Sequence, residues 1–314
     1  TKVMSLLIAW AYFHKRYEPE SGLSTNFLLI APNIIVLDRL KKDFAGRRIF
    51  DTDPVLPENG YEGHRARLAL PTGGFSNVTY SFRYGNVAVI ALDANDVSSE
   101  IPHPYSSGGQ TAWLDTELRR LRADPTIDFI VAFFHHCAYC TITSHGSDGG
   151  VRRSWVPLFD RYQVDLVVNG HNHGYERTTP IRGGVPTVDA PTGATVHPAD
   201  HGTTYICAGG GGKAPNELGR PGEGFVSNGP GAHDNPVTGE PEAAPWSVKA
   251  VADNGFLRVD VAPPAADGTT TMTLTAVDLD GNAFDRVVLA RRHARPAVEG
   301  GGGAQYDGAT LMTA

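Results

Sequence analysis

The sequence has little cysteine, little charge and no long apolar run, and each shortage excludes a class of protein. Three cysteines in 314 residues are too few for a disulfide-stapled scaffold, and their odd number leaves at least one thiol unpaired within the chain. No run reaches the roughly 18 apolar residues that span a bilayer, so we expect no membrane insertion. A net charge of -7 gives no basic surface for nucleic-acid phosphates, so we expect no nucleic-acid partner.

The composition that remains is typical of a globular protein rich in loops. Hydrophobic residues make up 41% of the chain, and 36 glycines with 22 prolines favour turns over a helical bundle. Residues 2–13 begin with a lysine and an apolar run, but no small-residue cleavage site follows them. We therefore recognise no signal peptide, and the sequence leaves the localisation and the oligomeric state open.

Strand and helix patterns alternate through the middle of the chain. Buried strands are predicted over residues 128–134 and 164–168, and helices with one apolar face over 110–123 and 155–162. This alternation favours βαβ units with parallel pairing. Other patterns predict a hairpin and a later antiparallel region: strands 78–82 and 87–92, then 248–251, 256–261 and 270–277.

The strongest chemical signal lies where these two buried strands end. The strand over 164–168 leads into Gly170-His171-Asn172-His173, and the strand over 128–134 leads into His135 and His136. Imidazole is the commonest neutral metal ligand, and histidines two residues apart in a loop can reach one ion cluster. A lone pair of this kind is more often incidental, but the strand ends are where open α/β sheets bind ligands.

The residues around these histidines resemble a known family. Gly170-His-Asn-His-Gly-Tyr-Glu-Arg177 and Phe133-Phe-His-His136 are similar to the last two metal motifs of the purple acid phosphatases, which are calcineurin-like metallophosphoesterases. The resemblance covers about residues 64–292. It implies an α/β fold, a β-sandwich flanked by helices (αββα), which here lacks its first βαβ units.

The resemblance also implies a set of site residues. His135 and His171 would bind one metal of a dinuclear centre and His173 the other, with Fe, Zn or Mn as the metal. His145 would protonate the leaving group, and Asp148 could orient it, although either residue could simply be solvated in its loop. The reaction would be hydrolysis of a small phosphate ester or nucleotide by a metal-activated water. Members of the family are often secreted.

Three earlier motifs of the family are absent from these 314 residues: Asp-x-Gly, Gly-Asp-x-x-Tyr and Gly-Asn-His. They would supply the carboxylates that neutralise two neighbouring cations. Asp51, Asp53, Asp93 and Asp96 do not stand in the matching places. We therefore expect that one metal could bind here instead of two and that hydrolysis is impaired. The alternative is a phosphoesterase fold that is catalytically inactive and serves binding or structure.

The start of the chain has a different character, and it leads to two further alternatives. Residues 1–60 resemble part of a DEAD-like helicase or restriction-enzyme ATPase domain without its phosphate-binding loop, which would make the chain a fragment of a nucleic-acid-dependent ATPase. We predict an N-terminal segment over 1–62, a phosphoesterase domain over 63–292 and a flexible glycine-rich tail over 293–314. Cys137 and Cys140 could form a local disulfide, remain buried thiols or bind zinc beside His135.

Overall fold

A computed structural model describes most of the chain beyond residue 73. Apart from Lys15, the described residues belong to the compact unit Gly73–Ala314. They are 74–76, 79–100, 102–142, 145–218, 237, 244–292 and, for the backbone alone, 309–313. The predicted N-terminal segment over 1–62, with its ATPase-like pattern, lies outside these residues, as does the predicted domain boundary.

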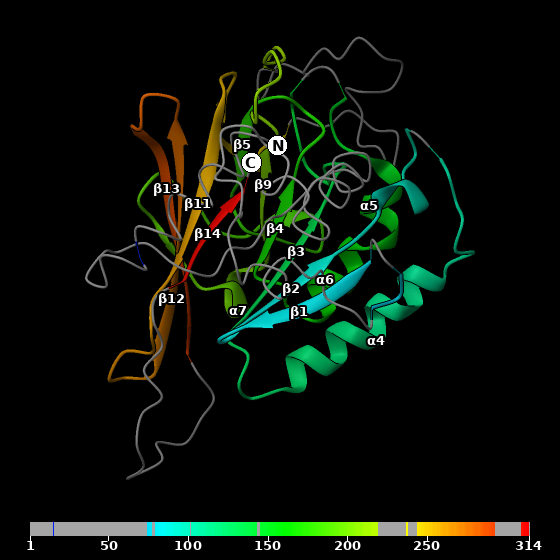
Figure 1. Ribbon diagram of the computed structural model, residues 1–314, viewed down its shortest axis with the longest axis horizontal. Coiled ribbons are helices and arrows are strands. Elements are labelled where there is room, and N and C mark those ends of the chain that lie inside the picture. Colours follow the sequence, from blue (N-terminus) through cyan, green and yellow to red (C-terminus); the bar gives the residue numbers. More distant parts are fainter. Residues whose placement is uncertain are drawn as a thin grey trace, which may run out of the picture. The chain divides into compact units, whose positions relative to one another are not determined.

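The core of the described unit is a seven-stranded sheet (Figure 1). Its strands, in spatial order, are β1 (Tyr80–Tyr84), β2 (Val87–Ala91), β3 (Phe129–Phe134), β4 (Leu166–Asn169), β9 (Thr204–Ala208), β5 (Tyr175–Thr178) and β10 (Ser247–Val251). The strands β2, β3, β4 and β9 pair in parallel, as the sequence predicted. Because parallel neighbours end at the same edge, the histidines after β3 and β4 meet there.

The predicted hairpin and the two predicted helices are present. The strands β1 and β2 pair antiparallel around Gly85, whose φ of 57° is easy only for glycine. Helix α4 (Gly109–Ala123) packs Leu114 and Leu118 into the core that β2 and β3 form. The expected helix over 155–162 is α6 (Val156–Arg161), and a second short helix, α5 (Gly149–Ser154), precedes it. These three helices lie on one side of the sheet (Figure 1).

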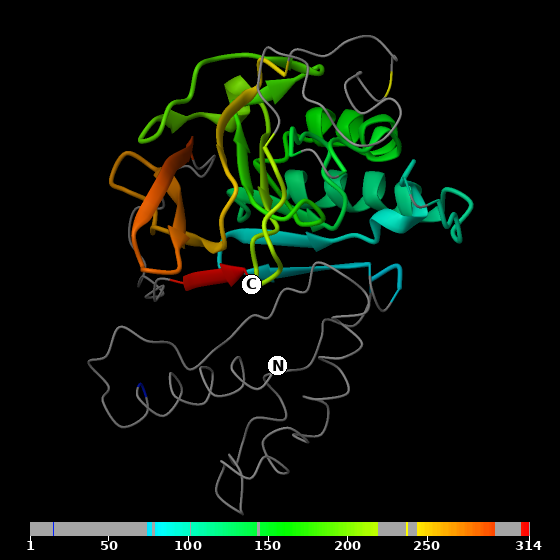
Figure 2. The same ribbon diagram turned by 90° about the horizontal axis from the view of Figure 1, so that it is seen from above.

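A second, five-stranded sheet lies on the other side of the seven-stranded sheet (Figure 2). Its order is β14 (Ala309–Thr313), β11 (Gly255–Val261), β12 (Thr269–Asp278), β13 (Ala283–Arg292) and β8 (Thr195–Val196). The smaller elements are the 3-10 helix η2 (Ala94–Asp96), the two-stranded pair β6 (Ile181–Arg182) and β7 (Val185–Pro186), and helix α7 (Pro198–His201).

The two sheets with helices on the outer face make the mixed α/β sandwich that the sequence predicted. The predicted strands of the second sheet are present as β11 and β12. Strand β14 pairs with β11 within residues 293–314, whose expected flexibility stays a prediction. None of the helices within the described ranges has the length and apolarity that crossing a bilayer requires.

Candidate metal centre

The candidate centre lies at the edge of the seven-stranded sheet where β3 and β4 end. Phe134 pairs with Asn169 in the parallel register, so His135 and Gly170 leave the sheet side by side. The Gly170 N–H donates to the His135 carbonyl at 3.0 Å and holds the two loops together. His171 adopts a φ of 63°, a left-handed conformation that is uncommon for a residue with a Cβ. Such outliers concentrate at functional sites.

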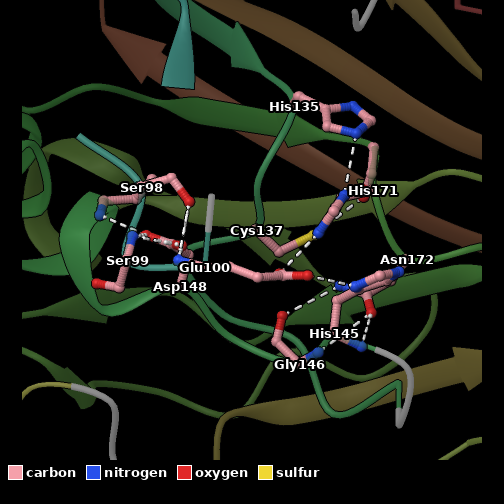
Figure 3. A network of polar contacts seen from close by, with 12 residues as sticks. Ser98, Ser99, Glu100, His135, Cys137, His145, Gly146, Asp148, His171 and Asn172 are labelled. Carbon is pink, nitrogen blue, oxygen red and sulfur yellow. Dashed lines mark hydrogen bonds and ion pairs between the residues drawn. The ribbon is translucent and has the colours of Figure 1, made fainter. Parts of the chain in front are cut away.

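His171 is the centre of the polar network in Figure 3. Its Nδ1 lies 3.0 Å from His135 Nε2, and its Nε2 lies 2.8 Å from Glu100 Oε2. The other carboxylate oxygen of Glu100 lies 2.7 Å from His145 Nδ1. The rings of His145 and His171 are 3.9 Å apart between centroids. The structure thus brings together three histidines predicted from the sequence and one glutamate that was not predicted.

The imidazoles of this site have the properties of metal ligands. Burial, followed by the charges of His171 and His136, lowers the pKa of His135 to about 4. Burial is also the main cause that lowers the pKa of His136, whose side chain is 1% exposed. Both rings are therefore neutral near pH 7, which is the form that binds metal.

Several nitrogen atoms of these rings lack a protein partner. His135 Nδ1 and both ring nitrogens of His136 are buried and make no hydrogen bond. A buried polar atom without a partner is costly, and a metal ion is one way to satisfy it. Ligand atoms of Glu100, His136 and His171 also lie within 4.8 Å of one another. The residues present therefore fit a bound cation, with His136 as an additional candidate ligand.

Glu100 supplies the negative charge of the site. Burial alone would raise the pKa of its carboxyl group, but the hydrogen bonds to His145 and His171 outweigh burial and lower that pKa. The carboxylate is therefore ionised and lies against two imidazoles. No sequence pattern predicts a role for this residue, because Glu100 stands in an irregular loop with no motif around it.

Asp148 has a different place from the one that the resemblance suggested. Its carboxylate caps α5 by accepting the Val151 N–H at 2.9 Å, and it also accepts the Ser98 hydroxyl at 2.7 Å and the Ser99 N–H at 3.0 Å. It thus fixes the loop that carries Glu100, and Glu100 in turn contacts His145. Asp148 can therefore orient His145 only through that loop.

His145 itself is positioned by Asn172. The backbone N–H groups of His145 and Gly146 both donate to Asn172 Oδ1 at 3.2 Å, and Asn172 Nδ2 donates back to the Gly146 carbonyl at 3.1 Å. Asn172 is fully buried. This side chain therefore ties the loop of His145 to the loop of His171 (Figure 3).

His173 contacts the segment that follows β9. Its backbone N–H donates to Asn216 Oδ1 at 2.8 Å, and its ring hydrogen-bonds the backbone of Ala214. Burial, and then the charge of Lys213, lowers its pKa. His173 does not belong to the group of ligand atoms around His171 within the described ranges. Its expected role as ligand of a second metal stays a prediction.

Comparisons with known proteins agree with this geometry. No family model matches the chain. The uncharacterized protein Rv2577 of Mycobacterium tuberculosis is 37% identical over 247 residues, which cover 71% of this chain and 47% of that protein. Purple acid phosphatase 21 of Arabidopsis thaliana is 30% identical over 141 residues, covering 43% of this chain and 30% of that enzyme. The chain thus spans about half the length of its mycobacterial relative.

A solved structure shows the same fold. The purple acid phosphatase PPD1 from yellow lupin seeds matches with a TM-score of 0.50 and 20% identity, over 75% of this chain and 37% of the lupin chain. With the sequence relatives, this likeness places the histidine cluster in a known architecture. The chain is thus similar in sequence and in fold to the purple acid phosphatases, which are calcineurin-like metallophosphoesterases.

Proposed function

We propose that this chain carries the histidine part of an acid-phosphatase-like site, where a metal-dependent reaction hydrolyses a small phosphate ester or nucleotide. The observation that carries the proposal is the position of His171 between His135 Nε2 and Glu100 Oε2, at 3.0 and 2.8 Å. The family relationship supports the same chemistry. His135 and His171 would hold one cation, with Glu100 and His136 within reach, whereas His173 matches the ligand of the second cation in the family's dinuclear centre.

The chain's own residues can then assist the reaction. A bound cation supplies Lewis-acid chemistry, activating a water for attack on phosphorus and neutralising the phosphoryl oxygens. When the His145 ring carries both protons, its Nδ1–H donates to the Glu100 carboxylate and its Nε2–H remains as a second donor. When water oxygen bonds to phosphorus and the ester P–O bond breaks, that proton would pass to the leaving alkoxide. Glu100 therefore serves two imidazoles at once.

The number of carboxylates near the histidine cluster limits the rate of hydrolysis that we expect. The aspartate motifs of the family are absent from these 314 residues, and Glu100 is the carboxylate that reaches the histidine cluster in the described residues. A single carboxylate balances only part of the charge of one divalent cation, whereas the carboxylates of the family balance the charges of two cations. We therefore expect one metal ion per chain at this site and slow hydrolysis.

The test is hydrolysis of a chromogenic phosphomonoester with added Mn²⁺, Zn²⁺ or Fe²⁺. We expect turnover in the wild type that disappears with a chelator and in His171→Ala. His197→Ala is the matched control, because His197 is an exposed histidine outside the cluster and its variant should keep the wild-type rate. Equal turnover in wild type and His171→Ala, or no turnover with any of these metals, would contradict the proposal.

The competing function is an inactive binding or structural domain. Chelation separates the two without an activity assay. If the histidine cluster binds a cation, chelation should lower the melting temperature of the wild type by more than that of His171→Ala, which lacks this ligand. In an inactive scaffold the cluster should hold no metal, and the chelator should change both melting temperatures equally.

A further inference from the structure

All three cysteines of the sequence meet at one buried point. Cys137 and Cys140 lie in the loop after β3, and Cys207 lies near the end of β9, on the other side of β4. Each is at most 1% exposed, and their three sulfur atoms lie within 4.8 Å of one another. The three are free thiols in this structure. Thiols from distant segments come together only through a specific fold, so this cluster suggests a chemical function for the three side chains.

The cysteine cluster touches the loop that carries His171 but is separate from the histidine cluster. The sulfur atoms of Cys137 and Cys207 lie 3.2 and 3.3 Å from the Gly170 carbonyl oxygen. Cys207 also lies 3.3 Å from the Asn172 carbonyl oxygen. His135 is not part of the group, since its Nε2 lies against His171. The third thiol partner of Cys137 and Cys140 is therefore Cys207 rather than a histidine.

We propose that Cys137, Cys140 and Cys207 form a second metal site, a structural Zn²⁺ site completed by the Gly170 carbonyl oxygen. Thiolates are the ligands that zinc prefers in structural sites, and tetrahedral Zn–S bonds of about 2.3 Å place the sulfurs about 3.8 Å apart. The sulfur atoms need to move by no more than about 1 Å to reach this spacing. The Gly170 oxygen already lies beside two of the three sulfurs.

Charge and proton balance favour zinc over a monovalent soft metal. Binding replaces the three S–H protons, which leave for the solvent, and forms three Zn–S bonds with no change of oxidation state. Three thiolates with a divalent cation leave one negative charge, whereas Cu⁺ would leave two in a fully buried place. Without metal, the Gly170 and Asn172 carbonyls accept the S–H groups of Cys137 and Cys207, so the site can also persist unloaded.

Such a site would also stabilise the two loops that carry the histidine cluster. Cys137 is two residues after His135, and Gly170 directly precedes His171. A metal that binds Cys137 and the Gly170 carbonyl would join these two loops by ligand bonds, in addition to the single backbone hydrogen bond between them. The inference does not depend on the proposed hydrolase function, because it rests on the thiols alone.

Cobalt provides the test, because Co²⁺ occupies zinc sites and its bonds to thiolates give intense charge-transfer bands in the near ultraviolet. The reduced, metal-free chain should develop these bands as Co²⁺ is added, and Zn²⁺ should abolish them. Cys140→Ser and Cys207→Ser should each lose most of the band intensity and bind one Zn²⁺ fewer. His171→Ala should keep the thiolate bands while losing metal from the histidine cluster.

A matched variant separates ligand loss from misfolding. Ile142→Val changes a buried neighbour of the three cysteines and carries no ligand, so it should keep the bands. Circular dichroism checks that each cysteine variant is folded, and wild-type thiol counts in denaturant report the redox state. Wild-type chain that shows no thiolate band, or whose Cys137 and Cys140 form a disulfide that persists in the reductant used, would overturn the proposal. Unchanged bands in Cys207→Ser would overturn it as well.

Discussion

At the scale of residues, Glu100 is the acidic member of the site, and its carboxylate contacts both His171 and His145. His135 and His171 were predictable because each follows a buried apolar strand, and parallel strands end together. Glu100 was not, since its place depends on hydrogen bonds from its loop to the distant Asp148 carboxylate. Long-range contacts of this kind leave no periodic signal in the sequence. The acidic member of the site therefore appears only with the fold.

Replacing Glu100 tests its part in metal binding. In Glu100→Gln the carboxylate charge is lost while the size is kept, so we expect Zn²⁺ affinity of the histidine cluster to fall by about 10- to 100-fold. Titration calorimetry measures this in a chain whose cysteines are blocked or occupied. Glu117→Gln, on α4 and paired with Arg120, is the control. Wild-type affinity in Glu100→Gln would show that the carboxylate does not serve the metal.

His135 gives a prediction for pH in the metal-free protein. Its pKa is about 4 in the folded chain, against about 6.5 in an unfolded one, so between these values only the unfolded chain binds the proton. Its contribution to stability is therefore complete above about pH 6.5 and is lost as the pH falls toward 4. Urea denaturation at pH 7 and 4.5 should show a smaller loss in His135→Gln than in wild type. Equal losses would refute this account.

At the scale of elements, α5 is a helix that the sequence did not predict. Its first residues, Gly149 and Gly150, disfavour a helix, and the sequence pattern indicated one only from residue 155. The Asp148 cap and close packing explain it: a Cβ on Gly150 would meet the Val97 carbonyl oxygen at 1.7 Å. Gly150 is therefore required for the close contact with the loop before Glu100, and the two glycines weaken the local helix signal.

Asp148→Ala should therefore damage both the helix and the site. It removes the cap of α5 and leaves the Ser98 hydroxyl and Ser99 N–H without this acceptor, so we expect a loss of about 1–3 kcal/mol in the free energy of unfolding. Chemical denaturation measures the loss, and Zn²⁺ affinity should fall too. Asp115→Ala breaks the ion pairs with the exposed Arg119 and Arg161 and the hydrogen bond from the Tyr162 hydroxyl, and it should cost only about 1 kcal/mol. Similar losses in the two variants would contradict this role.

At the scale of the whole described unit, a fully buried ion pair joins the two sheets. Arg177 on β5 makes two bonds to Asp285 on β13, at 2.6 and 3.0 Å, and both side chains are fully buried. Tyr175 adds a hydrogen bond to Asp285 at 2.7 Å. The Tyr-Glu-Arg triplet that marked the family in the sequence therefore includes two residues that hold the sandwich together, which spacing alone could not show.

Removing Asp285 should destabilise the unit strongly. In Asp285→Ala the Arg177 guanidinium stays buried without its partner, so we expect a loss of about 3–5 kcal/mol in the free energy of unfolding. Asp260→Ala is the matched control, because Asp260 pairs with Arg258 on the exposed side of β11 and its loss should cost under about 1 kcal/mol. Denaturant titration compares them. A loss below that of the control would refute the role of the buried pair.

The layers of the fold were predictable from apolar runs and turn residues, because these encode strands, helices and parallel pairing locally. The contacts between layers were not, since Arg177 and Asp285 stand far apart in the sequence. The same limit applies to the cysteine cluster, whose members come from the loop after β3 and from β9. The histidine cluster and the cysteine cluster both depend on such long-range contacts, so they could be recognised as complete sites only in the folded structure.

The most direct test of the central claim is anomalous X-ray scattering at the zinc edge from crystals grown with Zn²⁺ and phosphate. The account predicts an anomalous peak within ligand distance of His171 and His135, with Glu100 beside it and a phosphate ion bound to the metal. Crystals of His171→Ala grown in the same way should lack that peak. An empty histidine cluster in the wild type, or phosphate bound elsewhere without metal, would contradict the claim that this cluster is a phosphoesterase metal centre.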